Sequence, residues 1–203
     1  MRGLLKSEEN GDSVMIKNEE DIILLIEKDT WMMNVLKYTK SLSLPDWWIC
    51  AGFVRSKIWD SVHGFEKKTP LPDVDVIYFD ASNMCETIDK NLEEKLYALA
   101  PSIPWSVKNQ ARMHLVNQVP PYRSSEDAIS KFPETATALG VKLDEKDKVI
   151  LTAPHGIQDA INLEIKPTPY FMETKERMAM YEKRIRSKNW GSKWAKVEIK
   201  HER

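Results

Sequence analysis

The sequence of 203 residues contains only two cysteines, Cys50 and Cys85. So few cysteines indicate no disulfide framework and favour a reducing compartment. Long apolar runs are missing as well, since no run approaches the roughly 18 residues that a membrane-spanning helix needs. No basic segment followed by an apolar block and a cleavage site resembles a secretory signal. We therefore expect a cytoplasmic protein with no membrane partner.

The chain also has little net charge, −1 at pH 7. Such a balance gives no strong bulk attraction to nucleic acid, so a free nucleotide is favoured over a polymeric RNA substrate. The sequence has no Gly-x-x-x-x-Gly-Lys loop, which excludes a Walker-type NTPase. No serine stands in a nucleophile-elbow context, and His63 and His155 lack partners at zinc-binding spacing.

The composition, 42% hydrophobic and 30% charged, is typical of one globular domain. We expect residues 1–17 to form a disordered tail and residues 18–203 a single domain with a helical C-terminal extension. Asn18 and Thr30 are the expected caps of the first two helices. The pattern predicts helices over 19–28, 31–42, 87–99, 110–117, 126–132 and 171–188, and a further helix that begins at residue 53. It predicts strands over 47–51, 73–79, 105–108, 149–152 and 163–165. Residues 134–141 are ambiguous. Strands separated by helices indicate an α/β (α+β) fold with a small mixed sheet.

Two carboxylates, Asp73 and Asp75, stand two residues apart in an otherwise apolar segment. The β-branched and aromatic neighbours predict a strand, in which residues i and i+2 face the same side. Two like charges on one face repel each other. A divalent cation relieves that repulsion, because carboxylate oxygens are ligands that suit Mg²⁺. The alternative is an edge strand whose polar face is simply solvated.

Gly52 lies between the apolar run 47–51 and a segment with apolar residues at helical spacing. Free amides at the start of a helix favour an anion, and glycine lets a phosphate approach the backbone closely. Arg55, one turn into this helix, is suited to a forked contact with phosphate oxygens. Taken alone, Gly52 also fits an ordinary tight turn, and Arg55 also fits a solvated helix residue. Together with the two acids they predict both halves of a metal–triphosphate site.

The run Ala51-Gly52-Phe53-Val54-Arg55, followed by Asp73-Val74-Asp75-Val76, resembles motifs of the polymerase-β-like nucleotidyltransferases. These are the Gly-Gly-x-Val-Arg-Asp and Asp-x-Asp motifs of poly(A) polymerases and tRNA CCA-adding enzymes. Segments 52–64, 69–80, 105–114 and 153–156 resemble a group of short, mostly uncharacterised bacterial nucleotidyltransferase-like proteins. The resemblance covers about residues 47–169. It implies that Asp73 and Asp75 are catalytic and hold Mg²⁺ (or Mn²⁺), and that an NTP binds against Gly52, Phe53, Arg55 and Ser56.

The chain departs from the family pattern at three places. Ala51 replaces the first glycine, and Ser56, which can donate a hydrogen bond to phosphate, replaces an aspartate. The family places a third carboxylate on the strand after the Asp-x-Asp strand, and residues 105–109 carry no acid. Asn109 in that segment can coordinate a cation but cannot act as a general base. Asp159 or Glu164, near a late apolar run, is the alternative source of that carboxylate.

Lys108, Asn109 and Arg112 form a polar cluster at the start of a short predicted helix. The lysine and the arginine are four residues apart and can share a helix face, where they would add positive charge near the triphosphate or support the substrate. An ordinary solvated face explains the same pattern equally well. The basic segment 183–200 is likewise interpreted as a solvated helix.

These observations lead to two functional hypotheses. The first is a Mg²⁺-dependent enzyme that moves a nucleotidyl group from an NTP to a hydroxyl of a small molecule, a protein or an RNA end. The second is a catalytically inactive nucleotide-binding or regulatory protein that keeps the metal–NTP pocket, as the lack of an acid in residues 105–109 suggests. A structural domain with a vestigial motif is a third interpretation.

Overall fold

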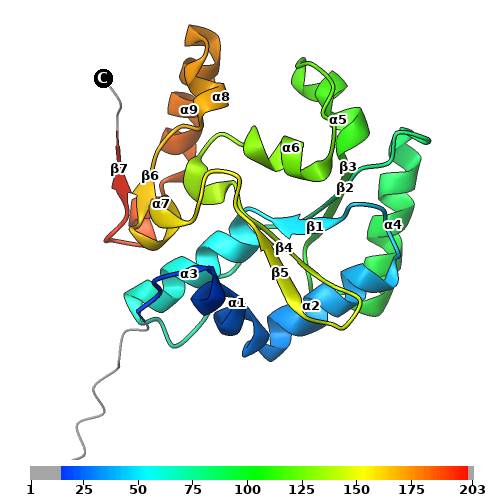
Figure 1. The fold of residues 1–203 in the computed structure, drawn as a ribbon, viewed down its shortest axis with the longest axis horizontal. Helices are drawn as coiled ribbons and strands as arrows, with labels where there is room; N and C mark the ends of the chain where they lie inside the picture. The colour runs from blue at the N-terminus through cyan, green and yellow to red at the C-terminus, as the bar shows by residue number, and fades with distance from the viewer. Residues whose placement is uncertain (1–14, 201–203) are drawn as a thin grey trace, which may run out of the picture.

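The computed structural model describes residues 15–200, and its centre is a five-stranded mixed sheet with strand order β3-β2-β1-β4-β5 (Figure 1). The strands are β1 (Trp48–Cys50), β2 (Val74–Tyr78), β3 (Trp105–Asn109), β4 (Gly140–Leu143) and β5 (Val149–Thr152). Only β2 and β3 run parallel; the other neighbouring pairs are antiparallel. A separate parallel pair is formed by β6 (Glu164–Ile165) and β7 (Glu198–Ile199). The predicted mixed sheet flanked by helices is confirmed.

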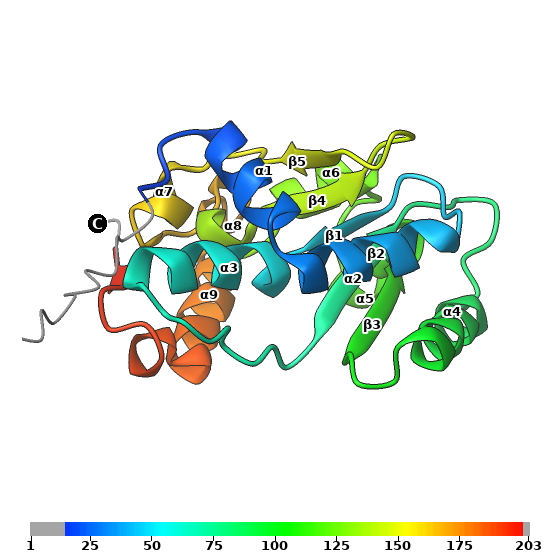
Figure 2. The same cartoon turned by 90° about the horizontal axis from the view of Figure 1, so that it is seen from below.

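Helices cover both faces of the sheet. The helices are α1 (Glu19–Glu27), α2 (Thr30–Ser41), α3 (Gly52–His63), α4 (Glu86–Leu99), α5 (Gln110–Asn117), α6 (Ser125–Ser130), α7 (Gln158–Ile161), α8 (Pro169–Met172) and α9 (Lys175–Lys188), with 3-10 turns η1 (Thr135–Thr137) and η2 (Trp190–Ser192). In Figures 1 and 2, α1, α2 and α3 lie on one side of the sheet and α6 on the other, while α4 lies beside the edge strand β3. None of these helices is long and apolar enough to cross a membrane.

Local side-chain chemistry fixes most helix ends. Asn18 caps α1 as predicted and accepts a hydrogen bond from the Asp21 amide. The predicted Thr30 cap of α2 is wrong, because the Asp29 carboxylate accepts from the Met32 amide and Thr30 is the first helical residue. The single helix predicted over 171–188 is also interrupted. Thr174 adopts an extended conformation and caps α9, which ends α8 before it.

The alternation along β2 sends its side chains to two different sides. Val74, Val76 and Tyr78 are buried in the main core, which also contains residues of α1–α4. Ile77 joins Trp48 and Cys50 in a second cluster that is closed by Ile129 of α6 and Ala138. Asp75 alternates with Val74 and Val76 and therefore lies on the side of this second cluster. The fold thus brings the second acid to the face that is only partly covered by α6.

The C-terminal segment packs into the main core. Tyr181 and Ile185 of α9, followed by Trp190 and Trp194, are all buried there. Trp194 donates its Nε1–H to Asp60 of α3 at 2.7 Å, and the same carboxylate accepts two hydrogen bonds from Thr69. Asp60 therefore ties the C-terminal segment to the loop that leads into β2. Of the predicted tail 1–17, residues 1–14 lie outside the described residues, and Ile16 is buried in the core.

Candidate active site

The two acids lie next to the turn that joins β1 to α3. In the antiparallel register, Asp75 is paired with Cys50, the last residue of β1. Asp73 precedes β2 and is exposed, whereas Asp75 is largely buried. Both carboxylates act electrostatically on the Cys50 thiol and on the Arg55 guanidinium. Asp73, Asp75 and the start of α3, which the sequence separates by about twenty residues, are thus brought together.

The environment of Asp75 disfavours its charge. Burial and the neighbouring Asp73 carboxylate raise the pKa of Asp75 to about 6, while Lys188, Arg184 and Arg55 oppose this effect. Burial, with a smaller contribution from the two acids, also raises the pKa of the Cys50 thiol. Cys50 therefore remains a neutral thiol at pH 7 and does not serve as a nucleophile. A cation bound at the two carboxylates would favour their ionised forms.

Helix α3 begins without a side-chain cap. Its N-cap residue, Ala51, donates its amide to the Leu139 carbonyl, and its own carbonyl accepts the amide of Arg55. Among the described residues, the first three amides of α3, at Gly52, Phe53 and Val54, have no acceptor outside the helix. Such amides, together with the helix dipole, attract an anion. The start of α3 has the features of a phosphate-binding site.

Ala51 adopts a backbone conformation that normally requires glycine, with φ 56° and ψ −117°. A side chain in this region costs on the order of 1–3 kcal/mol. We predict that Ala51→Gly raises the free energy of unfolding by about 1 kcal/mol, since relief of strain exceeds the added entropy of the unfolded chain. Urea denaturation measures this change.

A matched control lies at the other end of the same helix. Gly64 follows α3 with φ 69°, so Gly64→Ala should lower the free energy of unfolding by about 1 kcal/mol. If Ala51→Gly also lowers it, the backbone strain assigned to Ala51 is wrong.

Arg55 is a buried cation without a hydrogen-bonding partner for its Nε atom. Its guanidinium carbon lies 5.0, 4.8 and 5.9 Å from the ring centroids of Trp59, Trp190 and Trp194. No carboxylate in the described residues forms a direct ion pair with it. Burial lowers the pKa of Arg55 to about 10, which leaves it charged at pH 7. The aromatic rings stabilise this charge.

The guanidinium of Arg55 lies back over the start of its own helix. A Cβ atom placed on Gly52 would be 3.6 Å from an Arg55 terminal nitrogen. The absence of a side chain at position 52 therefore keeps open the space between the free amides and the guanidinium. Gly52 and Arg55 thus lie close together at the start of α3.

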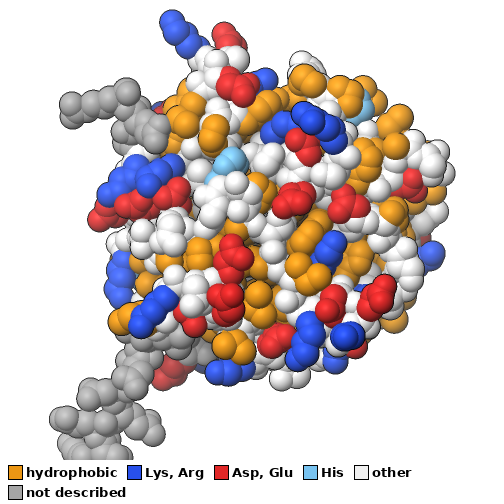
Figure 3. All heavy atoms as spheres, viewed as in Figure 1, with side chains coloured by type: hydrophobic (Ala, Val, Ile, Leu, Met, Phe, Trp, Pro, Cys, Tyr) orange, Lys and Arg blue, Asp and Glu red, His pale blue; other side chains and the backbone are white. Residues whose placement is uncertain are grey.

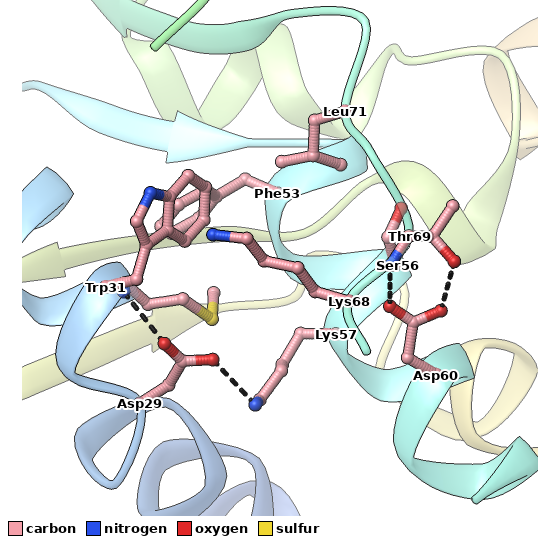
Figure 4. Close-up of a pocket in the computed structure, with 10 residues that line it drawn as sticks. Asp29, Trp31, Phe53, Ser56, Lys57, Asp60, Lys68, Thr69 and Leu71 are labelled. Atoms are coloured by element: carbon pink, nitrogen blue, oxygen red, sulfur yellow. Dashed lines mark hydrogen bonds and ion pairs between the residues drawn. The ribbon is translucent and has the colours of Figure 1, made fainter. Parts of the chain in front are cut away.

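Phe53 and Ser56 point to a different side of α3. Both line a small pocket with Trp31 and Lys68, shown in Figure 4. Phe53 packs against Trp31 with ring centroids 5.8 Å apart, and the Ser56 hydroxyl is buried without a hydrogen-bond partner. The structure does not bring these two side chains to the acids. Phe53 contributes to the helix start only through its backbone amide.

Lys108, Asn109 and Arg112 are occupied by partners away from the two acids. The β2–β3 register pairs Asn109 with Tyr78, three residues beyond Asp75. The Asn109 amide group donates to the carbonyls of Asp80 and Asn83 and its oxygen accepts from the amides of Asp80 and Ala111, so it links a turn to the start of α5. Lys108 lies 3.3 Å from Glu93, and Arg112 lies 2.7 Å from the buried Asp89.

The same register places Ser106 directly beside Asp75 on the neighbouring strand. No carboxylate stands at this position, because β3 carries none along its length. The alternative acids are engaged elsewhere: Asp159 and Glu164 both form ion pairs with Lys166, at 2.7 and 2.6 Å. Within the described residues, no three acidic, histidine or cysteine side chains converge as a complete metal site.

The site contains cations that the sequence analysis did not select. Arg184 and Lys188, both on α9, lie near enough to Asp75 to lower its pKa. Arg184 donates its Nε–H at 2.6 Å to Glu134, a fully buried carboxylate that also acts on Arg55. The basic composition of residues 183–200 was the available signal, although it does not tell which of its members face the acids.

Comparison with known families identifies the fold around this site. A sequence model described as nucleotidyltransferase matches residues 37–199, which include both acids, the α3 turn and α9. The chain belongs to this nucleotidyltransferase family. Among curated proteins, no match is found.

Solved structures agree with the family assignment. One NMR structure, described as a CCA-adding enzyme head domain, is 36% identical with a TM-score of 0.81, and the match covers 92% of this chain and 98% of that one. The Thermotoga maritima CCA-adding enzyme in complex with tRNA is 13% identical with a TM-score of 0.55. A CCA-adding enzyme in complex with CTP is 12% identical with a TM-score of 0.56. These last two matches show a shared fold, and the chain covers only 43% and 44% of those enzymes.

The surface of this nucleotidyltransferase shows interspersed charge. On the face drawn in Figure 3, basic and acidic side chains are scattered among hydrophobic and other uncharged groups. This face therefore offers no broad field of one sign that would attract a nucleic acid backbone.

Proposed function

We propose that this chain is a Mg²⁺-dependent nucleotidyltransferase that moves an NMP group from an NTP to a hydroxyl acceptor. The observation that carries the proposal is the convergence of Asp73 and Asp75 with the start of α3 and the Arg55 guanidinium. Phosphates and a divalent cation need opposite kinds of ligand, and these two kinds meet at this place.

The two carboxylates fit Mg²⁺ without a third protein ligand. Mg²⁺ is commonly held by one or two carboxylates, with water and substrate phosphates completing its octahedral shell. The like charges of Asp73 and Asp75, one of which has a raised pKa, would be neutralised by such an ion. When bound, Mg²⁺ would offset charge on the triphosphate and on the leaving pyrophosphate.

The residues of the chain have separate roles in this proposal. The free amides of α3 and the Arg55 guanidinium would hold the phosphates and orient them for in-line attack by the acceptor oxygen. The acceptor hydroxyl loses its proton to solvent and its oxygen forms a bond to the α-phosphorus, while the bond from that phosphorus to pyrophosphate breaks. Gly52 would let the phosphates approach the backbone. The acceptor is a small molecule, a protein or an RNA end; CTP and tRNA are bound by the structural neighbours described above.

A nucleotide-binding protein without turnover is the second candidate. The observation in its favour is Ser106, which lies beside Asp75 where a carboxylate would activate the attacking hydroxyl. A serine hydroxyl is a poor base at pH 7. This alternative shares the metal–NTP site and differs from the first only in the chemical step.

Thermal denaturation with each of the four NTPs separates these candidates from a vestigial site. We expect at least one NTP to raise the melting temperature, and only when Mg²⁺ is present. Release of pyrophosphate from that NTP in a cell extract, with label transferred to an acceptor, would then favour the enzyme over the inactive binder. No shift with any NTP at millimolar NTP and Mg²⁺ would refute both.

A further inference from the structure

The last turns of α9 are held against the candidate active site. Arg184 is fixed by its 2.6 Å contact with Glu134, and the other Glu134 oxygen accepts from the Thr137 hydroxyl at 2.7 Å. Trp190, two residues after α9 ends, packs edge-on against Trp59 with ring centroids 5.9 Å apart. The end of α9 is therefore positioned by Glu134, which precedes η1, and by the packing of the segment after α9 on α3.

Lys188 shares a helix face with Arg184, because the two residues are four positions apart. Lys188 is exposed, and no carboxylate among the described residues contacts it directly. Geometry brings this end of α9 near α3, because the ring centroid of Trp190, two residues after Lys188, lies 4.8 Å from the Arg55 guanidinium carbon. The Arg55 guanidinium, buried and with an unpaired Nε, lies between α3 and the segment that follows α9. Cations from two distant parts of the chain, α3 and α9, thus act electrostatically on Asp75.

The charges in this cluster are balanced until a metal binds. Arg55, Arg184 and Lys188 oppose Asp73, Asp75 and Glu134, three charges of each sign. A Mg²⁺ ion at Asp73 and Asp75 would leave the cluster with an excess of two positive charges. Such an excess suits a polyphosphate, and it arises only after the metal has occupied the acids.

We propose that Arg184 and Lys188 form a second half of the triphosphate site and bind the phosphates of a metal-bound nucleotide opposite the start of α3. This inference rests on the proposed function. It adds α9 to the active site and assigns to Lys188, the exposed member, a direct contact with phosphate. The Nε of Arg184 is bound to Glu134, and its remaining guanidinium nitrogens donate hydrogen bonds to the phosphates.

The test compares two lysines of the same helix. Lys188→Ala removes the exposed cation on the helix face of Arg184, and Lys183→Ala removes an exposed cation from another side of α9. Dissociation constants are measured by calorimetry in the presence of Mg²⁺ for the best-binding NTP and for inorganic tripolyphosphate. The melting temperature of each nucleotide-free variant is recorded, and Lys188→Arg tests whether a restored charge restores binding.

We expect Lys188→Ala to weaken both ligands by about tenfold, as for the loss of one charge-assisted hydrogen bond. Lys183→Ala should stay within about twofold of the unaltered protein, Lys188→Arg should recover most of the affinity, and the nucleotide-free melting temperatures should be equal. These results together support the inference.

Equal affinities of the Lys188→Ala and Lys183→Ala variants would overturn the role of α9 while leaving the proposed function intact. A loss for the NTP but not for tripolyphosphate would also overturn it, since Lys188 would then contact the nucleoside. If the unaltered protein binds no NTP with Mg²⁺, the proposed function fails, and this inference fails with it.

Discussion

Replacement of Asp75 by asparagine is expected to reduce nucleotidyl transfer on the order of a thousandfold. In the proposed function the variant loses one of two charged metal ligands, and metal stabilisation of the transition state amounts to several kcal/mol. Because Asn is nearly isosteric with Asp, the strand pairing of Asp75 with Cys50 and Ser106 should persist. Pyrophosphate release under saturating Mg²⁺ and NTP measures the loss.

The same substitution should stabilise the protein in the absence of metal and nucleotide. The folded-state pKa of Asp75, about 6, lies above the ordinary value of 3.8, so ionisation disfavours the folded state. The stability associated with the protonated carboxyl is fully present below about pH 4 and is lost as pH rises through about 6. At pH 7.5 the Asp75→Asn variant should therefore be more stable by on the order of 2 kcal/mol.

Glu94→Gln is the control, since Glu94 is an exposed carboxylate on α4 away from the acids. It should change neither activity nor the pH dependence of unfolding. An Asp75→Asn variant that keeps its activity would contradict the assigned role of Asp75. A variant that is less stable than the unaltered protein at pH 7.5 would contradict the unfavourable charge assigned to it.

Replacement of Arg55 by methionine is expected to lower kcat/KM by on the order of 10²–10³. The guanidinium is a buried cation beside the start of α3, and in the proposed function its terminal nitrogens contact the phosphates. Methionine retains apolar contact with the surrounding tryptophans and removes a buried charge, so these effects on stability largely offset each other. Steady-state kinetics and urea denaturation measure the two quantities.

The matched control for Arg55 is Arg186→Met on α9, where the side chain is 72% exposed. This control should leave kcat/KM unchanged. Arg55→Lys keeps the charge without the forked geometry and should recover only part of the activity. If Arg55→Met has unaltered kinetics, Arg55 serves the packing of the tryptophans and not the substrate.

Local patterns predicted the elements that carry the site. The alternation around Asp75 predicted β2, and the change from an apolar run to helical spacing at Gly52 predicted the start of α3. These signals depend only on neighbouring residues, so they are readable from the chain. The resemblance to nucleotidyltransferases, based on the same two motifs, is confirmed by the family match.

Strand register was the first property that the sequence did not reveal. The sequence pattern indicates Asn109 as the residue on β3 that stands in place of an acid, yet the parallel register pairs Asp75 with Ser106. A register shift of three residues moves a side chain by about 10 Å along a strand. Only the long-range pairing of β2 with β3 decides which residue faces the metal site.

Contacts between distant segments were the second property that the sequence did not reveal. Glu134 and Arg184 are 50 positions apart, and their ion pair fixes α9 against the segment before η1. The Ser56 hydroxyl can donate a hydrogen bond to phosphate, but the rotation of α3 directs this side chain into the pocket with Lys68. The strain at Ala51 was also hidden, because a positive φ at alanine is imposed by the surrounding fold and not by the local sequence.

A crystal structure with Mn²⁺ and a non-hydrolysable NTP tests the central claim most directly. We predict that anomalous scattering places the ion between the Asp73 and Asp75 carboxylates, with the phosphates against the first amides of α3 and the Arg55 guanidinium. A nucleotide bound elsewhere, for example in the pocket lined by Ser56 and Lys68, with no ion at the two acids, would contradict the account.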